Sequence, residues 1–241
     1  MTAAEKQKIA SFLDTAGDFL SSGYRSAQKD YNFADDAPPE NRQPQAADGS
    51  DTIEKIAAEI RACNRCQLCA KRKNAAPGEG VTRPLVMVIG EGPGAEEDAQ
   101  GRPFVGRAGQ LLDKMLSSIQ LSRNTNCFIA NVVKCRPPEN RDPYPEETSA
   151  CAGFLKRQIA LLSPKFILVA GRVAARTLLD TSEPVGKLRG KFMEYALDNT
   201  TIPLLITYHP AALLRNEELK RPAWEDLKLL RLRLEESGGG I

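Results

Sequence analysis

The sequence predicts an α/β fold with three layers, α/β/α, in which a mostly parallel central sheet lies between two layers of helices. Short apolar runs, such as residues 85–89 and 166–170, are each followed by glycine, which is typical of strands buried on both faces. Segments with helical apolar spacing alternate with these runs, and this alternation favours a parallel sheet covered on both sides. In such folds the functional residues lie at the carboxyl ends of the strands.

The elements of this domain begin after residue 51, and each is predicted from its apolar spacing. A continuous apolar run predicts a buried strand, whereas apolar residues on one side of a helical repeat, as in Leu111, Leu112 and Leu116, predict a helix. The expected strands cover residues 85–89, 127–133, 166–170 and 203–208. The expected helices cover residues 53–63, 108–119, 146–162, 172–179 and 222–235.

The first part of the chain differs in composition from the rest. Residues 1–21 carry apolar side chains at helical spacing, which predicts an amphipathic helix. Residues 22–51 are rich in Pro, Asp, Asn, Gln and Ala and predict a disordered linker. We expect the functional domain over residues 52–236 and a short tail over residues 237–241. The N-terminal helix either docks on this domain, which is the favoured interpretation, or contacts an unknown protein partner.

The overall composition excludes membrane proteins and secreted proteins. Of the 241 residues, 41% are hydrophobic and 27% are charged, as in ordinary soluble proteins. No apolar run approaches the roughly 20 residues that cross a bilayer. The N-terminus also lacks the basic and apolar regions of a signal peptide. We therefore expect a cytoplasmic protein that makes no membrane contact, and a monomer is the default oligomeric state.

Charge is distributed unevenly along the chain. The net charge is −5 over residues 1–60, +9 over residues 61–191 and −2 over residues 192–241. A basic surface attracts phosphate backbones by Coulomb attraction and counterion release. The basic middle of the chain therefore indicates either nucleic-acid binding or a lysine-rich solvated surface.

The six cysteines indicate metal ligation or catalysis, because disulfides are rare in the cytoplasm. Cys63 and Cys66 form a Cys-x2-Cys pair, and Cys135 and Cys151 follow at long intervals. No separate second Cys-x2-Cys knuckle completes a zinc ribbon, so the spacing favours an iron–sulfur cluster over zinc or no metal. Of the remaining two cysteines, Cys127 is expected to be a buried apolar residue. Cys69 is a less favoured alternative ligand.

Two glycine-rich segments lie beyond expected strands. Residues 90–94, Gly-Glu-Gly-Pro-Gly, follow the first strand, and such a loop is either a tight turn or a place where the backbone approaches a ligand closely. The spacing matches neither a Walker loop nor a dinucleotide fingerprint. Residues 101–106 place Phe104 in a glycine-bounded loop, where its ring is either a core residue or a stacking plate for a base.

Asn131 lies inside the expected strand over residues 127–133, near its carboxyl end, and His209 directly follows the expected strand over residues 203–208. A buried amide such as that of Asn131 needs hydrogen-bond partners, which are either structural groups or the edge of a pyrimidine. His209 is the only histidine and is followed by proline. A lone histidine is more often structural, but the carboxyl end of a strand favours a functional role. The sequence lacks the His-x-Glu of a zinc deaminase and the Gly-x-Ser-x-Gly elbow of a hydrolase.

Taken together, these segments resemble the family 4 uracil-DNA glycosylases, in an order that spans residues 60–235. The matching pieces are Cys63 with Cys66, residues 90–94, 101–106 and 131–140, Cys151, and residues 186–190 and 209–216. The resemblance implies a uracil-DNA glycosylase-like fold. It also implies an enzyme of base excision repair that hydrolyses the N-glycosidic bond of uracil in DNA and leaves an abasic site.

The resemblance further implies a cofactor and its ligands. In the family the matching cysteines hold a [4Fe–4S] cluster, which assigns Cys63, Cys66, Cys135 and Cys151 as its ligands here. The cluster would be structural, because it would fix loops near the DNA.

The resemblance also assigns roles to residues that contact the substrate. Phe104 would stack on a uracil flipped out of the duplex, and Asn131 would bind its O4 and N3–H edge. His209 would donate a hydrogen bond to uracil O2, where negative charge develops. Arg215 would belong to a loop that enters the minor groove.

The resemblance leaves two candidates for the residue that orients the attacking water. Gly90, Glu91 and Gly92 would form a wall beside uracil C5 and hold the sugar and the water. Family 1 enzymes have a water-orienting aspartate where this chain has Gly92, so Glu91 or Asn140 takes this role. The Lys-Arg-Arg-Ile-His insertion of related enzymes that crosslink to uracil is absent, which predicts turnover.

Two other classes of protein remain as alternatives. A non-catalytic iron–sulfur module for DNA binding or redox sensing would explain the cysteines and the basic middle. A zinc-stabilised nucleic-acid-binding protein would also explain them. Neither explains why Phe104, Asn131 and His209 all fall at loops or strand ends.

Overall fold

The computed structural model describes residues 7, 51–198 and 200–238. The chain divides into two units, Met1–Ala46 and Ala47–Ile241, and all elements named below belong to the second. The expected N-terminal helix and linker therefore lie outside the described residues, apart from Gln7 and Asp51. Across the ranges that the structure describes, no helix combines the length and the apolar character that a membrane span requires.

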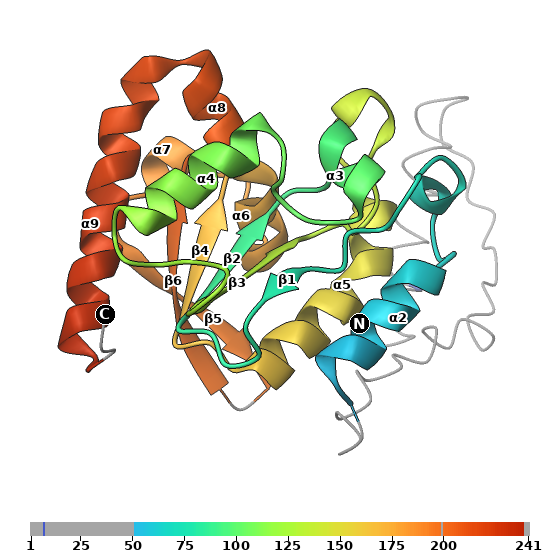
Figure 1. Ribbon diagram of the computed structural model, residues 1–241, viewed down its shortest axis with the longest axis horizontal. Helices are drawn as coiled ribbons and strands as arrows, with labels where there is room; N and C mark the ends of the chain where they lie inside the picture. Colours follow the sequence, from blue (N-terminus) through green and yellow to red (C-terminus); the bar gives the residue numbers. More distant parts are fainter. Residues whose placement is uncertain (1–6, 8–50, 199, 239–241) are drawn as a thin grey trace. The chain divides into compact units, whose positions relative to one another are not determined.

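A six-stranded sheet forms the centre of this unit (Figure 1), with the strand order β1-β3-β2-β4-β6-β5. The four inner strands are parallel to one another, whereas the two edge strands are antiparallel to their neighbours. The strands are β1 (Glu79–Gly80), β2 (Val86–Gly90), β3 (Cys127–Asn131), β4 (Phe166–Ala170), β5 (Phe192–Leu197) and β6 (Thr200–Thr207). The predicted mostly parallel sheet is confirmed.

The two edge strands are the ones that the sequence does not predict. Strand β1 has only two residues, too few to form an apolar pattern. Strand β5 is half exposed and so lacks the continuous apolar run of a buried strand.

Helices cover both faces of the sheet, which confirms the three layers (Figure 1). Along β2, Val86 and Val88 point into the core under one group of helices, and Met87 and Ile89 point into the core under the other. The first group is α4 (Arg107–Ser117) and α9 (Lys220–Glu236). The second is α2 (Ile53–Ala62), α5 (Pro145–Leu162), α6 (Arg172–Leu179) and α7 (Val185–Leu188).

Capping residues explain where several helices begin. The side chain of Thr52 accepts a hydrogen bond from the Lys55 amide at 3.2 Å and so caps α2. Helix α5 begins at Pro145 and α8 (Pro210–Arg215) begins at Pro210, a position at which proline loses no helical hydrogen bond. The sequence does not predict the short elements α3 (Ala95–Gln100), α8, η1 (Gln67–Ala70), η2 (Pro138–Asn140) and η3 (Glu217–Leu219).

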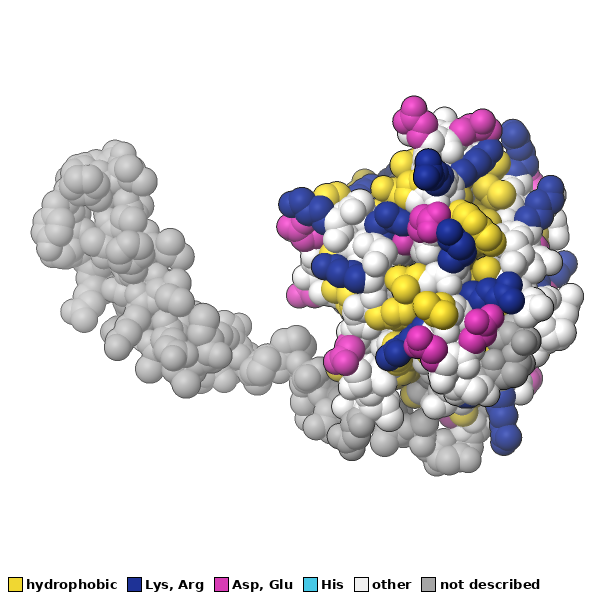
Figure 2. Space-filling view, turned by 90° about the vertical axis from the view of Figure 1, so that its left-hand side faces the viewer, with side chains coloured by type: hydrophobic (Ala, Val, Ile, Leu, Met, Phe, Trp, Pro, Cys, Tyr) yellow, Lys and Arg dark blue, Asp and Glu magenta, His cyan; other side chains and the backbone are white. Residues whose placement is uncertain are grey.

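The face on which α9 lies carries a mixture of charges. Figure 2 shows Lys and Arg side chains interspersed with Asp, Glu and hydrophobic side chains on this face. Neighbouring turns of α9 pair opposite charges, as in Arg231 with Glu235 at 2.8 Å and Lys228 with Glu225 at 2.7 Å. Such pairs are typical of a solvated helix surface.

Candidate active site

The carboxyl ends of the four parallel strands meet at one edge of the sheet, and a cleft of about 670 Å³ opens there. Strand pairing sets Gly90 opposite Asn131, and it sets Ala170 opposite Thr207, two residues before His209. Seven of the eight non-cysteine residues expected in the site line this cleft: Glu91, Gly92, Phe104, Asn131, Asn140, His209 and Arg215. Gly90, the eighth, lies behind them.

Gly90 allows two side chains to approach each other. A Cβ atom at this position would lie 2.5 Å from the Phe104 ring and 2.6 Å from Asn131 Oδ1. Its role is therefore to leave space for both side chains.

Asn131 holds an unpaired acceptor inside the cleft. The residue is 1% exposed. Its Oδ1 is the one buried side-chain nitrogen or oxygen in the described part of the chain that lacks a hydrogen-bond partner. Leaving such an atom unpaired costs about 1–3 kcal/mol. This cost indicates that a ligand supplies the missing donor.

The ring of Phe104 forms another wall of the cleft. The residue is buried, and its φ of 52° lies in the left-handed region, which a bulky residue rarely adopts. The centroid of its ring lies 5.5 Å from that of His209, with the two planes tilted by 32°.

His209 is held by the first turn of α8. Its Nδ1 accepts a hydrogen bond from the Ala211 amide at 3.1 Å, so the proton of the neutral ring lies on Nε2. Burial and, to a lesser extent, the charge of Arg215 lower the pKa of His209 to about 4. The ring is therefore a neutral donor at neutral pH.

Glu91 lies in the cleft as a carboxyl group with a perturbed pKa. Burial and the negative charge of Asp142 raise its pKa to about 7, and the charges of Arg172 and Arg215 limit this rise. Arg172 also forms an ion pair with Asp142 at 2.6 Å. Perturbed carboxyl groups in a cleft are typical of functional sites.

Asn140 and Gly92 lie beside Glu91 but in different surroundings. Asn140 is exposed, and its Oδ1 accepts a hydrogen bond from Arg136 Nε at 2.8 Å. A Cβ atom on Gly92 would lie 2.7 Å from a methyl group of Val133, so this position has no space for a side chain.

Arginines gather where the cleft opens. Arg215, at the end of α8, is exposed, and Arg141 and Arg172 line the same cleft. Positive side chains at the opening are suited to contact a phosphate backbone.

Five of the six cysteines line a second, much smaller cavity on the α2–α5 side of the sheet: Cys63, Cys66, Cys69, Cys135 and Cys151. Cys127 lies in the core on the opposite face, which agrees with its expected role as a buried apolar residue. In the described residues, no three His, Cys, Asp or Glu side chains are already arranged as a metal site.

The wall of this cavity carries positive charge that suits a cluster of thiolates. Arg65, Arg72 and Lys134 line it together with the cysteines. Arg72 Nη1 donates a hydrogen bond to Cys135 Sγ at 3.0 Å. Four thiolates bound to iron carry negative charge, which these side chains would partly neutralise. The donor set therefore fits an iron–sulfur cluster.

Lys134 connects this cavity with the strand end that carries Asn131. Its Nζ is buried and donates hydrogen bonds to the Asn131 carbonyl at 2.8 Å and to Gln158 Oε1 at 2.7 Å. Burial lowers the pKa of Lys134 to about 8. The two cavities are thus joined by one buried side chain.

Two features near His209, at Gly171 and Asp226, are not marked by any of the sequence motifs. A Cβ atom on Gly171, where φ is 95°, would lie 2.8 Å from His209 Cβ. Asp226 is fully buried and accepts hydrogen bonds from Thr207 Oγ1 at 2.7 Å and from Arg189 Nη2 at 2.7 Å. The signal for Asp226 was a charged residue on the apolar face of a predicted helix.

Comparison with known proteins identifies the family of this chain. The sequence pattern of the uracil DNA glycosylase superfamily matches residues 77–228. A type-4 uracil-DNA glycosylase of Pyrobaculum aerophilum is 42% identical over 193 residues, which cover 78% of this chain and 95% of the relative. A type-4 uracil-DNA glycosylase of Thermotoga maritima is 41% identical over 179 residues, which cover 73% and 91% of the two chains.

A more distant relative has the type-5 name. A type-5 uracil-DNA glycosylase of Thermus thermophilus is 34% identical over 117 residues, or 43% of this chain and 53% of the relative. The two type-4 proteins match the chain over a much longer stretch and at higher identity. The chain therefore belongs to the uracil-DNA glycosylase superfamily and, within it, to the type-4 family.

Proposed function

We propose that this chain is a monofunctional DNA glycosylase that hydrolyses the N-glycosidic bond between uracil and deoxyribose in DNA, leaving an abasic site. The observation that carries the proposal is the unpaired Oδ1 of Asn131 inside a cleft that Phe104 and His209 also line. The names of the type-4 relatives support it. Because these names are those of enzymes, they argue against a non-catalytic DNA-binding or sensing module.

Recognition of the base begins with its removal from the duplex. Flipping a nucleotide out of the stack costs a few kcal/mol, and the ring of Phe104 provides a stacking surface in return. The unpaired Oδ1 of Asn131 accepts the N3–H of uracil, and its amide group donates to O4. Cytosine has the reverse donor and acceptor pattern at these two positions, so the same amide rejects it.

Bond breaking then places negative charge on uracil O2. The Nε2–H of His209 donates a hydrogen bond to this oxygen, because Nδ1 is already engaged by the Ala211 amide. A donor preorganised in this way contributes about 3 kcal/mol of transition-state stabilisation.

A water molecule completes the reaction at the C1′ atom of the sugar. Glu91 is better placed to orient this water than Asn140, because Glu91 is half-buried in the cleft, whereas Asn140 is exposed and bound to Arg136. Near neutral pH a substantial fraction of Glu91 is ionised and can accept a proton. Because Gly92 has no side chain, it does not orient the water itself.

Uracil-containing DNA is the proposed partner, and Arg215 with its neighbouring arginines contacts its backbone beside the cleft. The protein acts on this DNA as a monomer, in the cytoplasm and at the nucleoid.

The proposed cofactor is a [4Fe–4S] cluster held by Cys63, Cys66, Cys135 and Cys151. When bound, the cluster supplies a covalent link between α2, α5 and the segment after β3, and it takes no part in bond cleavage. We expect the purified protein to be brown and to contain about four iron atoms per chain. Serine at any of the four positions should reduce the iron content, whereas Cys69→Ser and Cys127→Ser should not. Equal iron loss in Cys69→Ser would reassign one ligand.

The activity is tested by base release from a labelled oligonucleotide that carries one uracil. The same oligonucleotide with thymine serves as the substrate control, and His209→Ala is compared with wild type. We expect alkali-labile cleavage at uracil only, reduced about 100-fold in the variant. A folded, iron-loaded wild-type protein that releases no uracil would refute the proposed function.

A further inference from the structure

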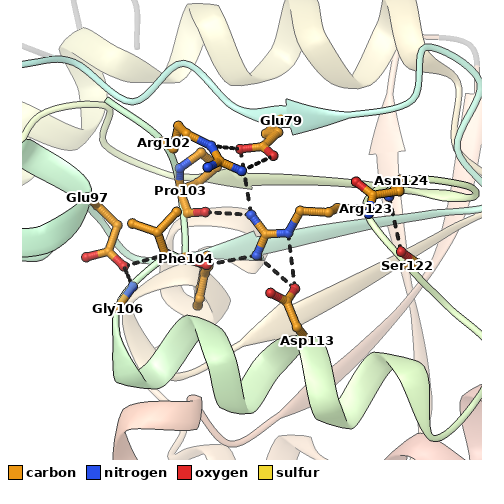
Figure 3. Close-up of polar contacts among 11 residues, drawn as sticks. Glu79, Glu97, Arg102, Pro103, Phe104, Gly106, Asp113, Ser122, Arg123 and Asn124 are labelled. Carbon is orange, nitrogen blue, oxygen red and sulfur yellow. Dashed lines mark hydrogen bonds and ion pairs between the residues drawn. The ribbon is translucent and has the colours of Figure 1, made fainter. Parts of the chain in front are cut away.

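The backbone around Phe104 is held by two charged side chains from outside its loop (Figure 3). Arg123 donates hydrogen bonds from Nη1 to the Pro103 carbonyl at 2.9 Å and from Nη2 to the Phe104 carbonyl at 2.8 Å. Glu97 Oε1 accepts hydrogen bonds from the Val105 amide at 2.9 Å and the Gly106 amide at 2.8 Å. Each of the four consecutive residues 103–106 therefore forms a hydrogen bond with one of these two side chains through a backbone N–H or C=O group.

Arg123 is itself held in place from two sides. It is 8% exposed, and its guanidinium bonds Asp113 on α4 at 2.8 Å and lies 3.7 Å from Glu79 on β1. It lines another hollow, of about 540 Å³, together with Phe104 and Val105, and it does not line the proposed base-binding cleft. Arg123 therefore acts on the cleft only through the loop.

Glu97 connects the Phe104 loop with the other glycine-rich loop of the site. Its second oxygen, Oε2, accepts a hydrogen bond from the Gly94 amide at 3.1 Å. One carboxylate thus fixes the relative position of residues 90–94 and 101–106. Both segments contribute walls to the cleft.

We propose that Arg123 and Glu97 are positioning residues that hold Phe104 in its left-handed conformation, with its ring beside His209 and Asn131. A bulky residue rarely adopts this conformation by itself, so the surrounding contacts must impose it. The inference rests on the proposed function, since it assigns these residues to the stacking wall of the same site.

The first test compares two arginines that differ in their link to Phe104. Lysine at position 123 keeps the charge but cannot reproduce the planar fork that binds two carbonyls and a carboxylate. Misplacing a substrate-contacting group by about 1 Å lowers a rate up to about 100-fold. We therefore expect Arg123→Lys to slow base release about 10- to 100-fold and to weaken competitive inhibition by free uracil.

The matched control is Arg157→Lys. Arg157 also bonds two carboxylates, those of Asp51 and Glu59, but it does so on α5, away from the Phe104 loop. This variant loses a comparable ion-pair network, so thermal unfolding of both variants corrects for a general loss of stability. We expect Arg157→Lys to leave base release and uracil inhibition within about 2-fold of wild type once folded protein is counted.

Glu97→Gln tests the other side of the loop with little change of shape. The amide oxygen can still accept from Val105 and Gly106, but the amide nitrogen then faces the Gly94 N–H, donor against donor. We expect an intermediate loss of base release, about 10-fold, and weaker uracil inhibition. This variant also serves if Arg123→Lys does not fold.

The decisive measurement is a double-mutant cycle with Phe104→Ala. If Arg123 acts through the ring, adding Arg123→Lys to Phe104→Ala should lower base release by less than about 3-fold further, whereas Glu97→Gln, which also disturbs Gly94, should keep part of its effect. The positioning role would be overturned if the losses of base release caused by the single substitutions multiplied in full in the double variant. It would also be overturned if Arg123→Lys behaved like Arg157→Lys. Wild-type protein that releases no uracil would instead refute the function, so the two failures are distinguishable.

Discussion

The rings of Phe104 and His209 lie 5.5 Å apart, although the two residues are 105 positions apart in the sequence, and their planes are tilted by 32°. Phe104 comes from a glycine-bounded loop and His209 from the start of α8. A base that stacks on the first ring therefore lies within reach of the second. Under the proposed function, both residues would contact the same base.

Removal of the Phe104 ring should weaken base binding. Base–aromatic stacking contributes about 1–3 kcal/mol by alanine substitution, so we expect Phe104→Ala to lower kcat/KM for base release and raise the inhibition constant of free uracil. Phe192→Ala, which removes a partly buried ring from the edge strand β5, controls for lost packing. Uracil inhibition equal to that of wild type would show that the ring does not contact the base.

Substitution of Gly171 by alanine should displace His209. The new Cβ would meet His209 Cβ at 2.8 Å, and the φ of 95° is unfavourable for any L residue. We expect Gly171→Ala to lower kcat about 10- to 100-fold. Gly153→Ala is the matched control, because nothing lies within 4 Å of its added Cβ within α5. This control should keep full activity and gain about 0.5–1 kcal/mol of stability.

Substitution of Asn131 by leucine should separate stability from activity. Leucine has nearly the same shape but no unpaired acceptor, so the free energy of unfolding should rise by about 1 kcal/mol. Base release should fall to background, because nothing then recognises the N3–H edge. Urea titration and the oligonucleotide assay measure the two effects. A destabilised variant would mean that Oδ1 has a structural partner in solution.

The inner strands and long helices could be predicted because their residues form uninterrupted patterns. Residues 166–170 are apolar throughout and form β4 with the predicted bounds. The strand expected over 127–133 ends two residues early, at Asn131, although Val132 and Val133 are also buried and still donate backbone hydrogen bonds to Gly90 and Glu91. Periodicity does not distinguish a buried strand from the buried loop that follows it.

The positions of the proposed site residues could be predicted from strand ends and from the family resemblance. The contacts that Arg123 and Glu97 make with the Phe104 loop could not be predicted, because neither residue belongs to a recognisable sequence pattern. Arg123 lies in a polar turn, and Glu97 is one of three consecutive acidic residues. Only the folded chain shows that both side chains bond the backbone beside Phe104.

The raised pKa of Glu91 predicts opposite pH dependences for activity and stability. If ionised Glu91 orients the water, kcat/KM should rise with pH between about 6 and 8, around its pKa of about 7. This rise should be absent from Glu91→Gln, whose residual rate should stay flat.

The stability effect follows because the pKa of Glu91 is higher in the folded chain than its ordinary value of 4.5. The favourable contribution of the protonated carboxyl is fully present below about pH 4.5 and is lost as the pH rises through about 7. The stability of Glu91→Gln relative to wild type should therefore increase from pH 5 to pH 8. Urea titrations at the two pH values measure this difference. A difference that is constant with pH would show that Glu91 is ionised at both values, and the pH dependence of catalysis would then need another group.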